Sequence, residues 1–204
     1  MVDTTFIEDL ASAAPAPGGG GASAYAGALS AALASMVGNL TVGKKTYADV
    51  EGEVRASLGR LEELRARLVA LVDEDARAFE PLSATYRMPK DTDEERAARH
   101  DAMQAALVGA CEVPLQIMRS VDAVVDEIDF LAHNGSRLAR SDAGVAATFA
   151  RAAIEGASLN ILINAASMED EDRAAFFRGE ALALVEAARE RCGRLFDYVM
   201  LEVS

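Results

Sequence analysis

The chain contains no tryptophan, and aromatic residues make up only 5% of its 204 residues. No stretch shows the regular alternation of apolar and polar residues that marks a half-buried strand. Alanine, leucine, glutamate and arginine dominate the composition instead. The sequence therefore predicts an all-α fold, and its length suits one helical domain over residues 1–204.

Positive charge is also scarce in this chain. Lysine and arginine number 20 against 33 acidic residues, which gives a net charge of −13. Proteins that bind nucleic acid need clustered basic residues to neutralise phosphates, and anionic membrane surfaces make a similar demand. We therefore expect no nucleic-acid partner and no membrane partner. An anionic ligand would need a local positive spot against the overall negative field.

Cysteine and histidine each occur only twice. Cys111 and Cys192 are far apart, each within a helical pattern, and the chain has neither a CxxC motif nor a signal peptide. These features predict reduced core cysteines in a cytoplasmic protein. His100 and His133 have no second histidine or cysteine at ligand spacing, so the sequence predicts no metal site.

The most distinctive stretch runs from Pro15 to Tyr47. Prolines stiffen the entry to four consecutive glycines, Gly18 to Gly21, whose backbone lets another group approach closely. The residues that follow are small or apolar on every face, which predicts a buried central helix that ends near residues 43–47. The polar cluster at its end comprises Asn39, Thr41, Lys44, Lys45 and Tyr47.

Residues 22–42 are long enough to span a bilayer, so a membrane helix is an alternative interpretation. However, alanine and glycine contribute little transfer free energy, and several serines and an asparagine interrupt the segment. Neither an aromatic belt nor a basic cluster flanks it. We therefore favour a buried helix in a soluble protein.

Capping boxes and prolines outline three further helices. Thr5 to Glu8 has the pattern that opens a short helix, and Thr92 to Glu95 has the pattern that opens another, expected to run to about residue 112. Between them, a helix is predicted over about residues 49–86. Pro81 is expected to bend or end that helix, and Pro114 to kink the following one or split it in two.

Asp75 falls on the apolar stripe of the helix predicted over residues 49–86, between Val72 and Phe79. A carboxylate on a buried stripe must be paired or hydrogen-bonded, or its pKa rises. One interpretation is a structural aspartate that bonds a neighbouring helix end. The other is a carboxylate that faces a cleft. The sequence leaves both open.

Ser141 and Asp142 directly precede an apolar run and are predicted as helix N-caps. Within that run, Gly156, Asn160 and Asn164 recur every four residues and therefore share one helix face. Asparagines on such a face are costly unless they are hydrogen-bonded. They serve either to hold helices together or to bind a ligand. A last helix is predicted over about residues 171–203, with one charged side.

Six strings carry a resemblance to a known family. In order from Phe6 to Asn164, they are PAPGGGG, NLTVGKKTY, MPKDTDEE, VPL, SDAGVAA and LNILIN. With them, the chain resembles the cyclodeaminase/cyclohydrolase family of folate enzymes. The stand-alone length and fourfold glycine are most similar to its bacterial methenyltetrahydrofolate cyclohydrolase branch. One departure is Asn134-Gly135, where the family commonly has Gly-Asn.

The resemblance implies an all-α homodimer, a bundle of long helices around the central helix, with a folate substrate in a cleft near the dimer interface. It implies hydrolysis of 5,10-methenyltetrahydrofolate to 10-formyltetrahydrofolate. The other branch implies closure of 5-formiminotetrahydrofolate with release of ammonia. The tetrahydrofolate derivative is the substrate, and neither reaction needs a metal or another cofactor. A non-catalytic folate-binding or scaffold dimer is the third alternative.

The implied reaction needs a group that takes a proton from water and one that delivers a proton to the leaving nitrogen. We assign the cation-facing or proton-shuttling role to Asp142, because a helix N-terminus favours negative charge. Lys44 or Lys45 is the candidate for proton transfer or oxyanion stabilisation. The candidate substrate-binding residues are Gly18, Gly19, Gly20, Gly21, Asn39, Tyr47, Ser141, Asn160 and Asn164.

Overall fold

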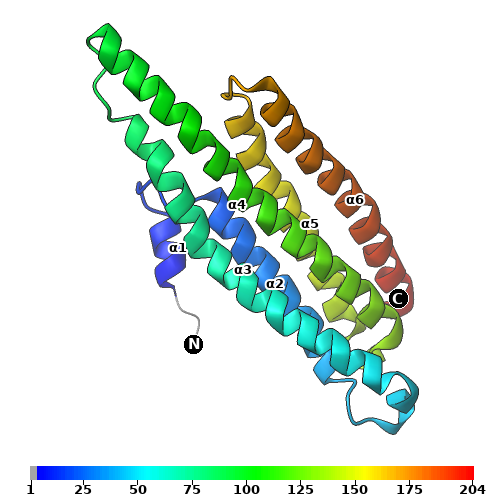
Figure 1. Cartoon of the computed structure of the whole chain (residues 1–204). Helices are drawn as coiled ribbons and strands as arrows, with labels where there is room; N and C mark the ends of the chain where they lie inside the picture. Colours follow the sequence, from blue (N-terminus) through cyan, green and yellow to red (C-terminus); the bar gives the residue numbers. More distant parts are fainter. Residues whose placement is uncertain (1–3) are drawn as a thin grey trace.

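The computed structural model describes residues 4–204, in which all regular structure is helical and no strand occurs. The prediction of an all-α fold is therefore confirmed. In chain order the elements are α1 (Thr5–Leu10), α2 (Gly19–Asn39), the 3-10 helix η1 (Lys45–Val50), α3 (Glu51–Thr85), α4 (Asp93–Asn134), the 3-10 helix η2 (Arg137–Ala139), α5 (Arg140–Ala165) and α6 (Glu171–Val203). The last helix has the predicted bounds. Figure 1 shows the long helices side by side in one elongated bundle.

Helix α2 lies at the centre of the bundle and contacts α3, α4 and α5. Its small side chains let the neighbouring helices come close. A Cβ atom added to Gly27 would lie 2.6 Å from Val121, and one added to Gly38 would lie 2.8 Å from Leu58. The prediction that this helix is buried holds for three of its sides only, because its outer face is exposed to solvent in a single chain. It ends at Asn39, before the predicted residues 43–47.

Helices α3 and α4 form a long antiparallel hairpin (Figure 1). The capping box at the start of α4 is confirmed, because the Thr92 hydroxyl accepts from the Glu95 amide at 3.2 Å and the Glu95 carboxylate accepts from the Thr92 amide at 3.1 Å. Pro81 and Pro114 both lie inside continuous helices, so the predicted helix end near residue 112 is wrong. A proline removes one hydrogen bond, and the buried side chains on both sides of Pro114 hold the helix together.

Helix α5 runs antiparallel to α2, and the hydroxyl of Ser30 donates to the carbonyl of Ala146 at 2.8 Å. The predicted N-caps of α5 are wrong by two residues. The 3-10 turn η2 runs directly into α5, so Ala139 is the N-cap and Ser141 and Asp142 lie in the first turn. The start of helix α1 also differs from the prediction, because its N-cap is Thr4 and not Thr5. The Thr4 hydroxyl donates to Glu8 at 3.0 Å.

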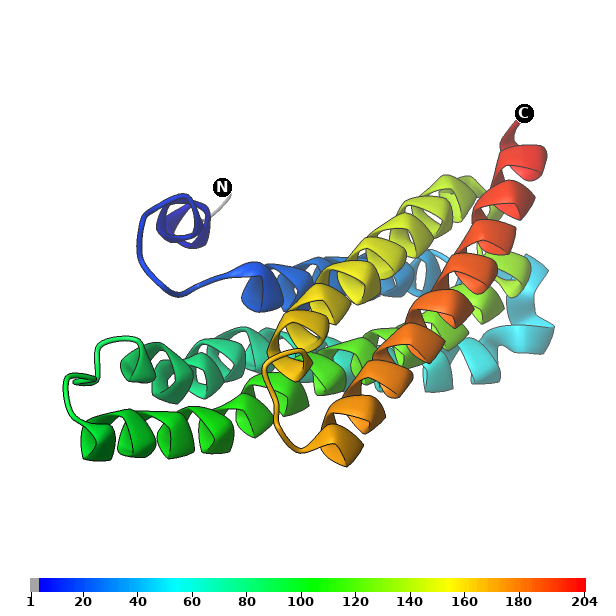
Figure 2. The ribbon, with the colours of Figure 1, turned by 90° about the horizontal axis from the view of Figure 1, so that it is seen from above.

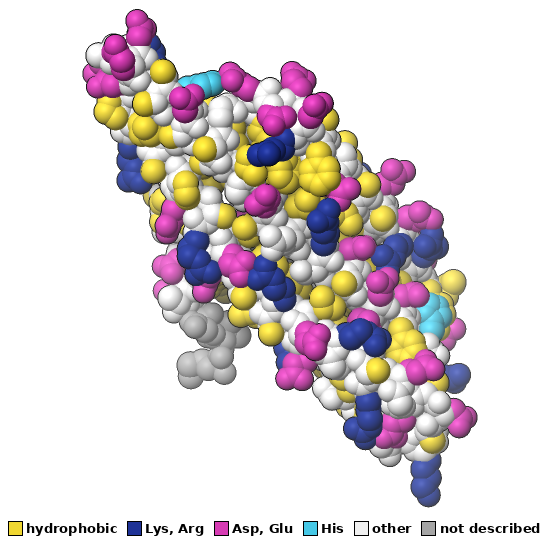
Figure 3. Space-filling model, viewed as in Figure 1, with side chains coloured by type: hydrophobic (Ala, Val, Ile, Leu, Met, Phe, Trp, Pro, Cys, Tyr) yellow, Lys and Arg dark blue, Asp and Glu magenta, His cyan; other side chains and the backbone are white. Residues whose placement is uncertain are grey.

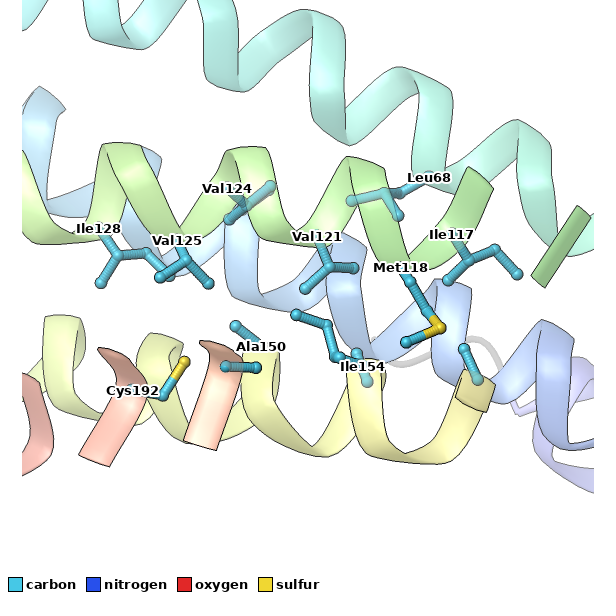
Figure 4. Packing of buried hydrophobic residues seen from close by; sticks show 14 of the residues in the cluster. Leu68, Ile117, Met118, Val121, Val124, Val125, Ile128, Ala150, Ile154 and Cys192 are labelled. Carbon is cyan, nitrogen blue, oxygen red and sulfur yellow. The ribbon is translucent and has the colours of Figure 1, made fainter. Parts of the chain in front are cut away.

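Helices α2 to α6 all contribute to the core, and on one side of α4 Val121 and Ile128 point toward Ile154 and Ala150 of α5 (Figure 4). Cys111 and Cys192 are both buried and unpaired, as predicted for reduced core residues. In contrast, acidic and basic side chains are interspersed over the outer face of the bundle (Figure 3). Over residues 4–204, no helix is both long and apolar enough to cross a membrane.

Candidate functional site

A pocket of about 340 Å³ opens where α2 begins. The glycine-rich segment forms one wall, and side chains from α3, α4 and α5 form the others. The polar part of the lining consists of Gly18, Gly19, Gly20, Asp75, Asn160, Asn164 and Ser167. The largest apolar or aromatic side chains in the lining are those of Phe79, Leu82, Tyr86, Met103, Leu107 and Ile163. We call this space the collar pocket.

The glycines differ in how tightly their surroundings hold them. A Cβ atom added to Gly20 would lie 2.2 Å from a carboxylate oxygen of Asp75, whereas nothing lies within 4 Å of the same position on Gly18. At Gly19 the nearest atom is the side-chain amide of Asn160 at 3.5 Å, which is an ordinary contact. Glycine is therefore needed at position 20, where the backbone of α2 comes against Asp75.

Asp75 is the carboxylate of the collar pocket, and it was not among the residues assigned to the site from the sequence. The backbone N–H of Gly21 donates to it, so this α3 side chain caps α2. Burial raises the pKa of the Asp75 carboxyl above its ordinary 3.8, and the Gly21 hydrogen bond opposes that rise only in part. The two alternatives that the sequence left open therefore both apply to Asp75. Its carboxylate accepts from the start of α2, and it also lines the pocket.

Asp75 also lacks a counter-charge. Within residues 4–204, no lysine, arginine or histidine forms an ion pair with it. Two other acids that are partly or fully buried do have such a partner, since Glu127 pairs with Arg60 at 2.6 Å and Asp122 pairs with Arg191 at 2.8 Å. The signal that pointed to Asp75 in the sequence was its place on an apolar stripe.

Asn160 and Asn164 line the collar pocket from α5, on the shared face that their spacing predicted. The Asn160 amide donates to the Gly156 carbonyl at 3.2 Å, and the Asn164 amide donates to the Ala110 carbonyl of α4 at 3.0 Å. In the described part of the chain, the side-chain oxygens of these asparagines have no hydrogen-bond partner. Asn164 therefore holds two helices together and still presents an acceptor to the pocket.

The lysines predicted for the site lie at the opposite end of α2. Lys44 is half-buried, and its ammonium donates to the hydroxyl of Ser136 at 3.1 Å. The hydroxyl of Tyr47 accepts from the backbone N–H of Arg137 at 3.1 Å. Lys45 is exposed. We call Lys44, Tyr47 and Ser136 the lysine cluster.

Asn39, Ser141 and Asp142 also lie toward this end of the bundle. Asn39 is the exposed last residue of α2, Ser141 is exposed, and Asp142 is half-buried in the first turn of α5. Helix α2 has 21 residues, so roughly 30 Å separate its two ends at 1.5 Å per residue. Inside one chain, the collar pocket thus gathers Gly18 to Gly20 and both asparagines, but Gly21, the lysines and Asp142 do not line it.

The described residues contain no group of three histidine, cysteine, aspartate or glutamate side chains that could hold a metal ion. Of the side chains that line the collar pocket, only that of Asp75 is acidic or basic. The pocket thus offers one half-buried carboxylate, two amide oxygens and apolar walls. Such an arrangement can bind a flat, partly polar ligand that carries a positive charge near Asp75.

Comparison with known proteins gives consistent results. Residues 3–183 match the family described as formiminotransferase-cyclodeaminase. The chain is 41% identical over 200 residues to the methenyltetrahydrofolate cyclohydrolase of Methylorubrum extorquens, an alignment that covers 98% of this chain and 96% of that protein.

Two further proteins share lower identity with this chain. The chain is 34% identical over 193 residues to the formimidoyltransferase-cyclodeaminase of Sus scrofa, covering 95% of this chain but 36% of that protein. Its fold matches a crystal structure of formiminotetrahydrofolate cyclodeaminase from Thermotoga maritima with a TM-score of 0.82 and 30% identity, over 98% of both chains.

Proposed function

The chain belongs to the formiminotransferase-cyclodeaminase family, and on this premise we propose that it is a methenyltetrahydrofolate cyclohydrolase. The observation that carries the proposal is the 41% identity to the Methylorubrum extorquens cyclohydrolase over 98% of this chain. The reaction converts 5,10-methenyltetrahydrofolate to 10-formyltetrahydrofolate. Water adds to the carbon between N5 and N10, and the bond from that carbon to N5 then breaks.

The collar pocket suits this substrate in size and chemistry. Its volume of about 340 Å³ lies in the range typical of small-molecule sites. Phe79 and Tyr86 provide faces against which a pterin ring packs, and the free oxygens of Asn160 and Asn164 accept hydrogen bonds from its N–H groups. The tetrahydrofolate derivative is the substrate, and the reaction proceeds by proton transfer without another cofactor.

An absorbance assay tests the proposal. The methenyl group of the substrate is a chromophore, and its hydrolysis in water removes the absorbance. We expect the purified protein to accelerate this loss far above the uncatalysed rate. A protein that leaves the chromophore unchanged at high enzyme concentration would contradict the assignment.

Cyclodeaminase activity is the second candidate, favoured by the likeness to the Thermotoga maritima structure over 98% of both chains. A cyclodeaminase closes 5-formiminotetrahydrofolate to the methenyl form and releases ammonia, through a tetrahedral adduct at the same carbon. The same assay distinguishes the two activities, because a cyclodeaminase creates the chromophore from the formimino substrate. A non-catalytic folate-binding dimer would change neither signal.

We further propose that the protein acts as a homodimer in the cytoplasm, held together through the outer faces of α2 and α5. No charged residue occurs between Leu10 and Gly43, although the outer face of α2 is exposed. Leu29 and Met36 are 40% and 46% exposed on that face. The exposed apolar side chains of the two helices are Tyr25, Leu29, Met36, Leu40, Val145, Phe149, Leu159 and Ile163. A face of this kind along two helices is typical of a protein interface.

Helix α1 supports the same assembly. It buries none of its own residues, stands away from the bundle (Figure 2), and touches the remainder through Phe6, whose ring lies 5.2 Å from that of Tyr25. Ile7 and Leu10 are exposed. A second copy seated on α2 would give these side chains a surface to pack against.

A two-fold axis that crosses α2 between Ala32 and Leu33 would place the two copies of this helix antiparallel to each other. Pairing Leu29 with Met36 of the partner subunit also pairs Tyr25 with Leu40 of the partner subunit. The same register carries Lys44 of the partner subunit to the level of Gly21. In this arrangement, the lysine cluster of one chain completes the collar pocket of the other.

Asp142 requires the same assembly, because it reaches the collar pocket only from a second copy. Its proposed role is to face the cationic substrate. Asp142→Asn keeps the size of the side chain, and we expect a folded variant that loses most turnover. Normal turnover in that variant would remove Asp142 from the reaction.

A further inference from the structure

We propose that Arg99 binds a carboxylate of the glutamate part of the folate and so sets the direction in which the substrate lies in the collar pocket. The inference rests on the proposed function, because it concerns the binding of that substrate. It assigns a binding residue to the outer end of the pocket, and it applies equally to the two candidate reactions.

The collar pocket follows the α3–α4 hairpin, which extends past the start of α2 (Figure 1). On α3, the lining runs from Asp75 through Phe79 to Tyr86, which at 1.5 Å per residue is a wall of roughly 16 Å. Asp75 and the glycines form one end of this wall, and Tyr86 lies at the other. The pocket is therefore elongated, with its carboxylate at one end.

Arg99 continues the lining of the pocket on α4. Four residues line the pocket from one face of α4, at intervals of three or four positions: Met103, Leu107, Ala110 and Pro114. Arg99 stands four residues before Met103, at the next position of that face. Its Nε donates to the carbonyl of Thr85 at 2.9 Å, and Thr85 directly precedes Tyr86. The guanidinium is thus held at the Tyr86 end of the pocket, away from Asp75.

Arg99 is half-buried and lacks a counter-charge. Within residues 4–204, the bond to Thr85 is its only hydrogen bond and it forms no ion pair. Glu95, the acid one turn earlier on the same face, instead accepts from the backbone amides of Asp91 and Thr92 at 2.8 and 3.1 Å. The terminal nitrogens of Arg99 therefore remain for a ligand, and a guanidinium matches the geometry of a carboxylate. In a chain with a net charge of −13, Arg99 is the local positive spot that an anion needs.

The order of charges along the pocket matches the order along the substrate. The methenyl substrate carries a positive charge over N5, N10 and the carbon between them, then an uncharged aromatic ring, and then the carboxylates of glutamate. The pocket has the Asp75 carboxylate at one end, apolar and aromatic side chains along its length, and Arg99 beyond the other end. In the reverse direction, the substrate would bring its carboxylates to Asp75, and like charges repel. Asp75 and Arg99 together thus favour the direction in which the methenyl group lies near the glycines.

The test compares two substrates, 5,10-methenyltetrahydrofolate and 5,10-methenyltetrahydropteroate, which has the same chromophore but lacks the glutamate. Arg99→Gln removes the charge and keeps an amide that can donate to Thr85. We expect this variant to raise KM for the folate by about 10-fold or more, as for loss of a charge-assisted hydrogen bond, with kcat little changed. KM for the pteroate should be the same in the variant and the wild type.

Arg96→Gln is the matched control, because Arg96 is exposed on the same helix and pairs with Asp93. This control should change KM for neither substrate. Arg99→Lys retains a positive charge, so it should recover part of the preference for the folate over the pteroate. A role confined to holding the hairpin together predicts no such preference.

The outcomes separate this inference from the proposed function. A wild-type protein that acts on neither the methenyl nor the formimino substrate overturns the proposed function, and this inference falls with it. An active wild type with the same kcat/KM for the folate and the pteroate overturns the role of Arg99 alone, and this measurement needs no variant. A folded Arg99→Gln protein whose KM changes equally for both substrates, or for neither, also overturns that role.

Discussion

The backbone N–H of Gly21 donates to the carboxylate of Asp75, so a side chain of α3 caps the first turn of α2. The N-cap residue itself is Gly18, which has no side chain to do this. One carboxylate thus performs two tasks, since it satisfies the start of the central helix and lines the collar pocket. A substitution that disturbs this contact should therefore change both the free energy of unfolding and the polar lining of the pocket.

Gly20→Ala should disturb both tasks. The added Cβ would lie 2.2 Å from the Asp75 carboxylate, so either the side chain or the helix must shift. We expect a loss of about 1–3 kcal/mol in the free energy of unfolding, which is typical of overpacking, together with a large loss of turnover. Gly59→Ala is the control, because nothing lies within 4 Å of its added Cβ and Gly59 does not line the collar pocket. Denaturant unfolding and the absorbance assay, applied to both variants, check the prediction; equal behaviour of the two would contradict it.

Asp75→Asn should make the protein more stable near neutral pH while it removes activity. The folded-state pKa of Asp75 is raised by burial, so its contribution to stability is favourable when it is protonated and is lost as pH rises through that pKa. Asparagine removes the buried charge and keeps an acceptor for Gly21. The unfolding midpoint of the variant should therefore exceed that of the wild type at pH 7, with the difference shrinking as pH falls. A variant that is less stable than the wild type at pH 7 would show that the charge–amide contact outweighs desolvation.

Lys44→Met and Lys45→Met should have different effects. Lys44 is half-buried and bonded to Ser136, whereas Lys45 is exposed. We expect the Lys44 variant to lose most turnover and the Lys45 variant to keep it, as measured by kcat under identical conditions. Wild-type rates in both variants would remove the lysines from the mechanism.

The proposed dimer is tested by placing a charge on the apolar face of α2. Leu29 is 40% exposed, so Leu29→Glu should leave the fold of each chain intact while opposing association through α2. We expect a monomer by sedimentation, with native helicity and little activity. Val69→Glu is the control, since Val69 is 53% exposed on α3, away from the proposed interface. A dimeric and active Leu29→Glu protein would place the interface elsewhere.

The sequence predicted the helices better than it predicted the site. Helix periodicity and capping depend on neighbouring residues, so the box at Thr92 and the shared face of Asn160 and Asn164 were recognisable. Pro114 was misjudged because tertiary packing on both sides of it outweighs one missing hydrogen bond. Asp75 was left undecided because its environment is made by Gly20 and Gly21, more than fifty residues earlier in the chain. Only the packing of α2 against α3 brings these residues together.

Mixing two inactive variants tests whether one site is built from two chains. Asp75→Asn damages the collar pocket, and Lys44→Met damages the lysine cluster. If partner chains supply these parts, a mixed dimer contains one site with both defects and one intact site. Random exchange of subunits should then restore about a quarter of wild-type activity, because half of the dimers are mixed and each has one working site of two.

The control for this experiment pairs Asp75→Asn with Gly20→Ala. Both changes affect the collar pocket of the same chain, so every site in a mixed dimer keeps one defect and no activity should return. Recovery with Lys44→Met but not with Gly20→Ala would mean that Lys44 and Asp75 act from different chains. If neither pair recovers although exchange is verified, the two residues do not meet across the interface. The roughly 30 Å between the ends of α2 in one chain would then leave Lys44 outside the site.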